Sequence, residues 1–263
     1  METVISRDGT TIAFDRVGQG PALVMVTGAM ASRALAGSAA SALEQHFTVF
    51  AYDRRGRGDS GDTAPYAVER EVEDIEAVIN SAGGSAFVFG HSSGAVLALE
   101  AARLLPTKVA KLAVYEPPFL IDHSRALLPV DYVAHLNELV ASGRRGDAVE
   151  YFMTQAVDIP PEGVTQARNS PMWPSLEAIA HTIAYDGTIM GDTMYGSSEP
   201  LQKWASVSMP TLVMDGGNSP AYMHHAAEKL ASILPNARHH RCSGQDHGVA
   251  DEVLAPALAE FFL

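Results

Sequence analysis

A serine between two glycines is the first group in this sequence that could do chemistry. Residues Gly90 to Gly94 read GHSSG, follow the apolar run Ala86 to Phe89 and precede a helix-forming segment that starts at Ser93. A G-x-S-x-G turn needs this context, with a strand before it and a helix after it. Because glycines lack the Cβ atoms that would collide in so sharp a turn, the sequence predicts a strained, exposed Ser92 that can act as a nucleophile.

Carboxylates follow two other predicted strands. Glu116 comes directly after one apolar run, and Asp215 ends another. In open α/β sheets, ligands bind at the carboxyl ends of the strands, so we expect both carboxylates at the same edge as Ser92. Two further residues at this edge, Gly28 and Asp53, come just after predicted strands.

Short β-rich runs alternate with amphipathic segments along most of the chain, which is typical of a mainly parallel sheet with helices on both faces. The predicted strands are residues 22–26, 47–52, 86–89, 109–115, 211–215 and 237–242. The predicted helices are residues 33–43, 68–82, 93–105, 222–234 and 249–262. Residues 3–6 and 10–17 flank a turn at 7–9, which predicts an antiparallel hairpin at the sheet edge.

The alternation stops between residues 119 and 209, where helical segments include residues 132–141 and 147–156. We interpret residues 119–209 as a helical cap inserted into a single domain, whose core consists of residues 1–118 and 210–263. A chain of 263 residues with 47% hydrophobic content can bury one sizeable core, and α/β proteins of this length commonly form one domain.

The charge balance narrows the class of partner. A formal net charge of -13 repels phosphate backbones and anionic lipids, so we expect a small-molecule partner and neither nucleic acid nor membrane. Cys242 is the one cysteine, which excludes an internal disulfide and suits the cytoplasm. We expect no signal peptide and no membrane span, because no apolar run approaches the roughly 20 residues that a span needs. Monomer and homodimer both remain open.

No metal site is predicted, although the sequence has 10 histidines. The adjacent pairs at 224–225 and 239–240 project neighbouring side chains in different directions, whereas two-histidine zinc motifs use i, i+4 spacing. We interpret both pairs as surface or rim residues.

With this serine turn and this order of elements, the chain resembles the α/β-hydrolase superfamily over its whole length. The resemblance implies an eight-stranded, mostly parallel sheet with helices on both faces and a helical cap after the sixth strand. It also implies the chain order nucleophile, acid, base. His247, in the segment GQDHG between the last strand and the last helix, is the histidine in the position of the base. Neither a cofactor nor a metal is implied.

The acid departs from the commonest family pattern, in which it follows the seventh strand. Ser219 occupies that place here, and a serine cannot balance an imidazolium charge. Glu116 offers a carboxylate one strand closer to Ser92, and the fungal zearalenone lactonases look similar in using a glutamate there. We predict Glu116 as the acid, with Asp215 as the alternative.

The family resemblance also implies an oxyanion hole built from two backbone N–H groups. One belongs to Ser93, directly after the nucleophile. The other belongs to Ala29, in a TGAM segment where relatives usually have His-Gly. The basic loop YDRRGRGDS at 52–60 resembles the family's usual loop, and we expect its arginines to form structural salt bridges. The predicted apolar lining of the substrate pocket is Met30, Met153, Trp173, Met190 and Tyr195.

These residues together predict a serine hydrolase that cleaves a carboxylic ester or lactone of a small to mid-sized, largely apolar substrate through a Ser-His-Glu triad and an acyl-enzyme. Two alternatives stay open. One is a small-molecule receptor, because plant karrikin and strigolactone receptors also look like this chain. The other is a non-hydrolytic enzyme of the same fold, such as a carbon–carbon bond hydrolase, a lyase or a cofactor-free oxygenase. Epoxide hydrolases and haloalkane dehalogenases are disfavoured, because they have an aspartate in place of Ser92.

Overall fold

A computed structural model describes all 263 residues. Eight strands form one sheet in the order β1-β2-β4-β3-β5-β6-β7-β8, in which β1–β2 and β2–β4 are antiparallel and the remaining pairs are parallel. The strands are β1 (Glu2–Ile5), β2 (Thr11–Val17), β3 (Ala22–Val26), β4 (Thr48–Tyr52), β5 (Ala86–His91), β6 (Val109–Tyr115), β7 (Thr211–Gly216) and β8 (Ala237–Cys242). The predicted mostly parallel sheet and its edge hairpin are confirmed.

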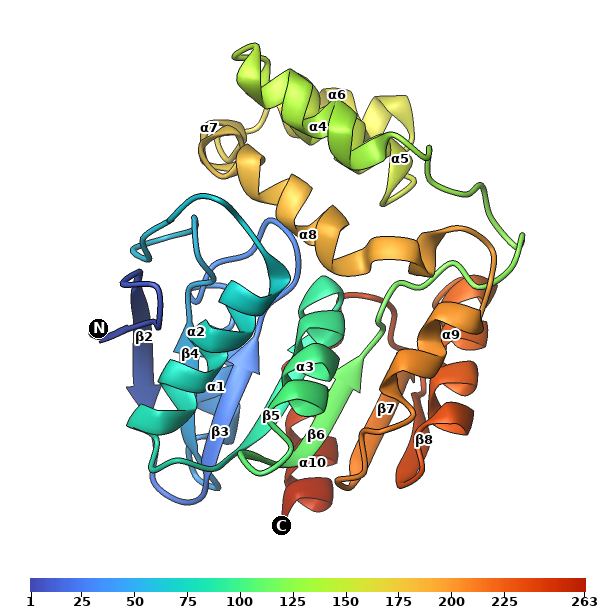
Figure 1. The fold of residues 1–263 in the computed structure, drawn as a ribbon. Coiled ribbons are helices and arrows are strands. Elements are labelled where there is room, and N and C mark those ends of the chain that lie inside the picture. The colour runs from blue at the N-terminus through green and yellow to red at the C-terminus, as the bar shows by residue number, and fades with distance from the viewer.

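Helices cover both faces of the sheet (Figure 1). One face packs against α1 (Gly37–Leu43) and α10 (Asp251–Phe262), and the other against α2 (Val68–Ser81), α3 (Ser93–Leu104) and α9 (Ala221–Ile233). Successive side chains of a strand point to opposite faces of the sheet. Because helices cover both faces, the central strands carry apolar side chains on both sides. On β3, for example, Leu23 and Met25 join the α1/α10 side, whereas Val24 and Val26 join the other.

One helix is shorter than predicted. The sequence favoured a helix over residues 33–43, yet α1 begins only at Gly37. The backbone N–H of Arg33 donates to the buried Asp53 carboxylate over 2.7 Å, and the Arg33 guanidinium also contacts that carboxylate. These bonds hold the residues before Gly37 in turns, which local helix propensity could not reveal.

Between β6 and β7 the regular elements are all helical, and they lie above the carboxyl ends of the strands (Figure 1). These are α4 (Tyr132–Ala141), α5 (Arg145–Gln155), α6 (Pro161–Arg168), α7 (Trp173–Ala178) and α8 (Ile183–Met190), with 3₁₀ turns η1 (Ala180–Thr182), η2 (Gly191–Met194) and η3 (Glu199–Trp204). We call this segment the helical segment. Its apolar side chains and those of the sheet form one core cluster of 46 buried residues, so the segment packs directly on the sheet.

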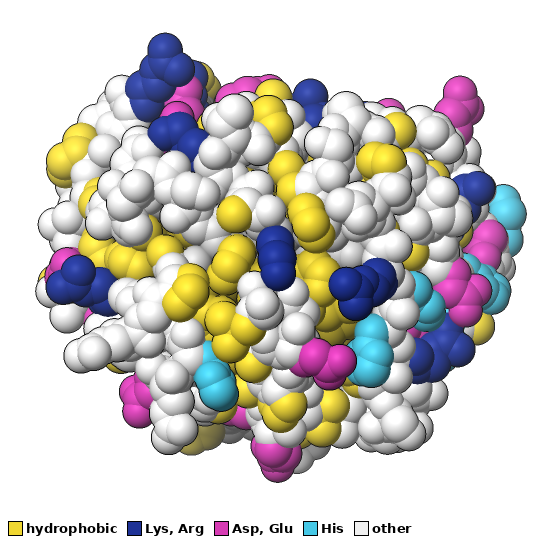
Figure 2. Space-filling model, turned by 90° about the horizontal axis from the view of Figure 1, so that it is seen from below, with side chains coloured by type: hydrophobic (Ala, Val, Ile, Leu, Met, Phe, Trp, Pro, Cys, Tyr) yellow, Lys and Arg dark blue, Asp and Glu magenta, His cyan; other side chains and the backbone are white.

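The opposite end of the molecule, seen in Figure 2, intersperses acidic and basic side chains among hydrophobic ones. Histidines and charged side chains gather towards the edge where β8 lies. None of the helices is both long enough and apolar enough to cross a membrane.

Candidate active site

Ser92 sits in a strained turn between β5 and α3. Its φ is 57° and its ψ is -129°, a conformation that residues with a Cβ rarely adopt. Both flanking glycines are needed, because a Cβ on Gly90 would lie 2.5 Å from the Gly94 carbonyl oxygen and a Cβ on Gly94 would lie 2.4 Å from the Val26 carbonyl oxygen. The glycine spacing that singled out Ser92 in the sequence therefore has a steric cause.

His247 and Glu116 form a hydrogen-bonded pair next to this turn. The His247 Nδ1 lies 2.7 Å from Glu116 Oε2, and the second carboxylate oxygen accepts the backbone N–H of Gly216 over 2.7 Å. Burial raises the pKa of Glu116, but the side chains of His247 and Ser219 and the backbone N–H of Gly216 outweigh burial and bring this pKa below its usual value. An ionised carboxylate can only accept, so His247 Nδ1 carries a proton, and in the neutral ring Nε2 is the nitrogen with the lone pair.

Ser92 and His247 line the same cavity, which has a volume of about 240 Å³. Ala29 and Ser93, the predicted oxyanion donors, line it as well. The Gly28 backbone passes so close to the serine that a Cβ on Gly28 would lie 2.8 Å from the Ser92 Cβ. Most of the remaining lining is apolar and comes from the helical segment and α9: Leu128, Tyr132, Phe152, Ile183, Met190, Met194, Tyr222 and Met223.

Of the five residues that the sequence predicts for the pocket lining, Met190 lines this cavity and the other four do not. Trp173 is 6% exposed and packs in the core under the Arg168 guanidinium, and Tyr195 is 40% exposed to solvent. Met30 and Met153 pack partly buried against the main core cluster rather than line the cavity. Composition alone could not separate apolar residues that face the cavity from those that hold the helices together.

Asp215, the alternative acid, is committed elsewhere. Its buried carboxylate is bonded by His224 Nδ1, by His239 Nε2 at 2.7 Å and by Arg241 Nε at 2.9 Å, and it has no hydrogen bond to His247. The interpretation of His224 and His239 as surface or rim residues was therefore incomplete, because both contact a fully buried acid. We call these four residues the Asp215 cluster.

Ser219, at the usual family position of the acid, is buried, and its hydroxyl lies beside the Glu116 carboxylate, whose pKa it helps to lower. The carboxylate that bonds His247 therefore comes from the end of the neighbouring strand, β6. Glu116 meets His247 from the end of β6 with φ at 47°, so its backbone, like that of Ser92, is in the left-handed region. No feature of the sequence indicated this conformation for Glu116.

The loop that carries His247 is held by two side chains of neighbouring strands. His91 Nε2 lies 2.9 Å from the His247 carbonyl oxygen, and the Tyr115 hydroxyl donates to the Asp246 carbonyl oxygen over 2.6 Å. Burial and the nearby His247 lower the pKa of His91 to about 4, so its ring is neutral and Nε2–H is the donor. Sequence reasoning missed His91, although it stands directly before the serine.

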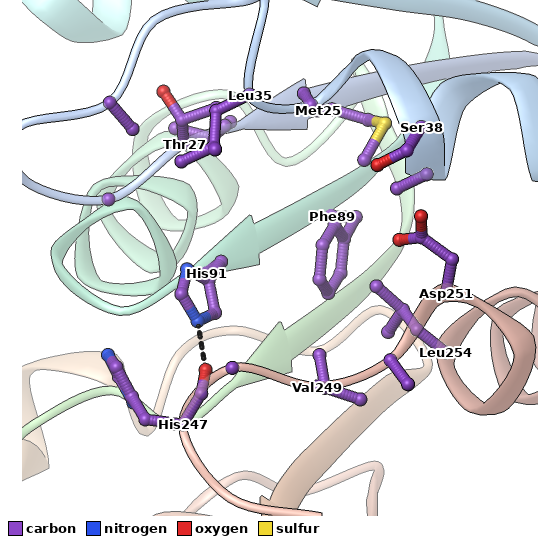
Figure 3. Close-up of a pocket in the computed structure, with 17 residues that line it drawn as sticks. Met25, Thr27, Leu35, Ser38, Phe89, His91, His247, Val249, Asp251 and Leu254 are labelled. Carbon is purple, nitrogen blue, oxygen red and sulfur yellow. Dashed lines mark hydrogen bonds between the residues drawn. The ribbon is translucent and has the colours of Figure 1, made fainter. Parts of the chain in front are cut away.

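A second cavity of about 390 Å³ lies on the α1/α10 side of this loop (Figure 3). Figure 3 shows His91 and His247 at one end and Ser38 and Asp251 at the other, with Phe89 between them. Ser92 does not line this cavity. The histidine loop therefore separates the two cavities.

The arginines of the loop at 52–60 are buried and paired, as predicted. Arg54 forms two hydrogen bonds with Glu71, at 2.7 and 2.8 Å, and Arg55 forms two with Asp74, both at 2.8 Å. Sequence reasoning also missed Asp186, which lines the cavity and accepts the Ser93 hydroxyl over 2.7 Å. A signal existed, since Asp186 is the one charged residue of α8.

A mostly parallel sheet with a strained serine on the turn after β5, a carboxylate directly after β6 and a histidine in the loop after β8 defines the α/β-hydrolase class of fold. The chain belongs to the alpha/beta hydrolase family, whose sequence model matches residues 23–257.

Solved structures agree with this assignment. An alpha/beta hydrolase from Sphaerobacter thermophilus DSM 20745 is 54% identical, with a TM-score of 0.92 and 100% of both chains covered. A thermophilic esterase from Thermogutta terrifontis, with malate bound, has a TM-score of 0.74 at 20% identity over 98% of this chain and 96% of its own, which shows a shared fold. Lipase LipV from Mycobacterium tuberculosis is 33% identical over 84 residues, only 32% of either chain.

Proposed function

We propose that this protein is a serine hydrolase that cleaves carboxylic esters or lactones through an acyl-enzyme on Ser92. The observation that carries the proposal is the 2.7 Å hydrogen bond between His247 Nδ1 and the buried Glu116, on a histidine that lines one cavity with Ser92. That bond fixes the tautomer in which Nε2 can take a proton. Esterases and lipases among the similar proteins support ester bonds as the target.

In the proposed reaction, Ser92 Oγ attacks the carbonyl carbon while His247 Nε2 takes the hydroxyl proton. Negative charge develops on the carbonyl oxygen and is stabilised by the N–H groups of Ala29 and Ser93. The tetrahedral intermediate collapses, and His247 passes the proton to the departing alkoxide. Water then repeats the sequence on the acyl-enzyme, with His247 as its base, and releases the acid and free Ser92.

The cavity favours a small apolar acyl group. Its volume of about 240 Å³ lies below the roughly 300–1,000 Å³ of typical ligand pockets, and 11 of its 18 lining residues are hydrophobic. Asp186 is the one acidic residue in the lining, and it is already bonded by two arginines. We therefore expect short-chain esters and small lactones to be turned over faster than long-chain ones.

Ser92→Ala tests the nucleophile. We expect the variant to lose at least about a thousandfold in kcat on p-nitrophenyl butyrate, because removing a catalytic serine leaves only binding and oxyanion stabilisation. A fluorophosphonate probe should label the wild type and spare the variant, as read by intact-protein mass spectrometry. Ser232→Ala, an exposed serine of α9, is the matched control and should behave like the wild type.

Two outcomes would redirect the proposal. Labelling that persists in Ser92→Ala would place the nucleophile elsewhere. A single turnover per molecule, with Ser92 labelled but no steady state, would favour a small-molecule receptor over an enzyme. A screen of esters, lactones and thioesters of graded acyl size would then define the substrate.

A further inference from the structure

We propose that Arg57, held in place by Asp186 of the helical segment, orients and polarises the peptide that supplies the Ala29 oxyanion donor. This inference rests on the proposed function, because it assigns positioning residues to that reaction. Arg57 belongs to the loop at 52–60 and is 1% exposed, and Asp186 lies on α8 and is 4% exposed.

The peptide between Gly28 and Ala29 is fixed through its carbonyl. Arg57 Nη1 donates to the Gly28 carbonyl oxygen over 2.6 Å, a short, charge-assisted bond. In a trans peptide, C=O and N–H point in opposite directions. Because the Gly28 C=O points at the arginine, the Ala29 N–H of the same peptide points away from it. Ala29 lines the cavity with Ser92, so an oxyanion on that side can accept the N–H.

The arginine also strengthens this donor. A positive charge on a peptide carbonyl draws electron density away from the N–H, and hydrogen bonds in series strengthen one another in a water-excluded interior. Arg57 thus polarises this peptide more strongly than a neutral donor would. The usual histidine of the oxyanion loop is absent here, where the segment reads TGAM, and Arg57 bonds this peptide from outside the loop.

Asp186 joins both donor segments to the helical segment. One carboxylate oxygen accepts Arg57 Nη2 over 2.6 Å, and the other accepts both Arg54 Nη1 and the Ser93 hydroxyl over 2.7 Å. Ser93 carries the second proposed oxyanion N–H. Burial raises the pKa of Asp186, but Arg57, Arg54 and Ser93 outweigh it and keep this pKa below its usual value.

The charges in this buried group balance. Arg54 pairs with Glu71 and Arg57 pairs with Asp186, so the two cations face two carboxylates. Thr182, also from the helical segment, accepts Arg57 Nε over 3.1 Å. A single guanidinium therefore bonds the oxyanion loop on one side and the helical segment on the other.

The test compares Arg57→Met with Arg55→Met. Arg55 is an equally buried arginine of the same loop, but its partners are Asp74, Asp8 and the Arg70 carbonyl, none of them in the oxyanion loop. We expect Arg57→Met to lower kcat by about tenfold to a hundredfold with KM changed less than threefold, because the Ala29 N–H loses its fixed orientation and this donor acts mainly in the transition state. Arg55→Met should lower thermal stability and leave kcat within threefold of the wild type.

A spectroscopic readout separates positioning from a merely structural role. The carbonyl stretch of a cinnamoyl acyl-enzyme trapped at low pH, measured by Raman difference spectroscopy, should move to higher frequency in Arg57→Met and stay unchanged in Arg55→Met. Arg57→Lys keeps the positive charge but loses the planar guanidinium with its several donors, so its carbonyl frequency should lie between those of the wild type and Arg57→Met. The double variant Arg57→Met/Asp186→Leu leaves no unpaired buried charge, so it guards against simple misfolding.

An unchanged carbonyl frequency in a folded Arg57→Met, or equal losses in kcat for Arg57→Met and Arg55→Met, would overturn the inference. Failure of the wild type to form any acyl-enzyme would instead overturn the proposed function. The two failures are thus distinguishable in one set of measurements.

Discussion

Two buried carboxylates at the ends of adjacent strands, Glu116 and Asp215, both bond histidines, yet only one belongs to the proposed site. Glu116 has one histidine partner, and its other oxygen takes a backbone N–H. Asp215 is bonded by two histidines and an arginine. The regions even touch, because the N–H that Glu116 accepts belongs to Gly216, directly after Asp215.

The difference lies in what the histidine faces on its far side. His247 lines the cavity with Ser92, with its side chain 41% exposed, whereas His224 and His239 do not line that cavity. A carboxylate–histidine pair supplies a base only where the second ring nitrogen meets a nucleophile. The Asp215 cluster instead ties α9 and β8 to the end of β7, which is a structural task.

Exchanging each acid for its amide should distinguish the proposed catalytic role of Glu116 from the structural role of Asp215, and it should give the largest difference in kcat. Glu116→Gln should lower kcat by on the order of a hundredfold or more, because the neutral amide no longer fixes the His247 tautomer or stabilises the imidazolium. Asp215→Asn should change kcat less than fivefold. Steady-state kinetics on one ester measure both, and the reverse ranking would assign the acid to Asp215.

Acid pH should then affect the His247 region through His91. Because burial and His247 lower the pKa of His91 to about 4 in the folded protein, the unfolded chain, with a pKa near 6.5, binds a proton first as the pH falls. The contribution of His91 to stability is therefore complete above about pH 6.5 and is lost progressively down to about pH 4. We expect a loss of on the order of 2–3 kcal/mol over this window.

His91→Asn should flatten that dependence. Urea unfolding at several pH values between 7 and 4 measures the slope for the wild type and the variant. His240→Asn, at an exposed histidine of β8, is the control and should keep the wild-type slope. A His91→Asn slope as steep as that of the wild type would contradict the lowered pKa of His91 in the folded protein.

The smallest effect is expected on the stability that the Asp215 cluster provides. Asp215→Asn should lower the free energy of unfolding by about 1–2 kcal/mol, because charge-assisted bonds to three partners weaken while those partners stay partly exposed to water. Urea unfolding at pH 7 measures the change. A variant as stable as the wild type would show that the cluster contributes no net stability.

The sequence was sufficient for the sheet, its edge hairpin and the helical stretch between β6 and β7, because these depend on local periodicity. The turn at Ser92 was equally predictable from the sequence, because steric crowding requires its two glycines and their spacing is visible in the sequence. The fold class also followed from the order of the elements, which the match over residues 23–257 confirms.

Contacts between segments that are distant in the sequence could not be predicted. The bond from Arg57 to the Gly28 carbonyl joins residues 29 positions apart, and that from Arg57 to Asp186 joins residues 129 apart. Likewise, nothing in the sequence showed which methionines face the cavity or that two histidines close on Asp215. Such pairings depend on three-dimensional placement, which one sequence without its relatives does not encode in any local pattern.

The backbone conformations described above also bear on how this protein could be engineered. The residues other than glycine with positive φ are Met30, Ser92, Glu116 and Asp158. Asp158 is exposed, and aspartate tolerates this conformation well, so relaxing it would gain little. The other three stand at or beside the proposed chemistry. A search for a hardier variant that starts by relieving backbone strain will therefore reach the reactive centre first, and heat resistance is better sought in the helices and the sheet.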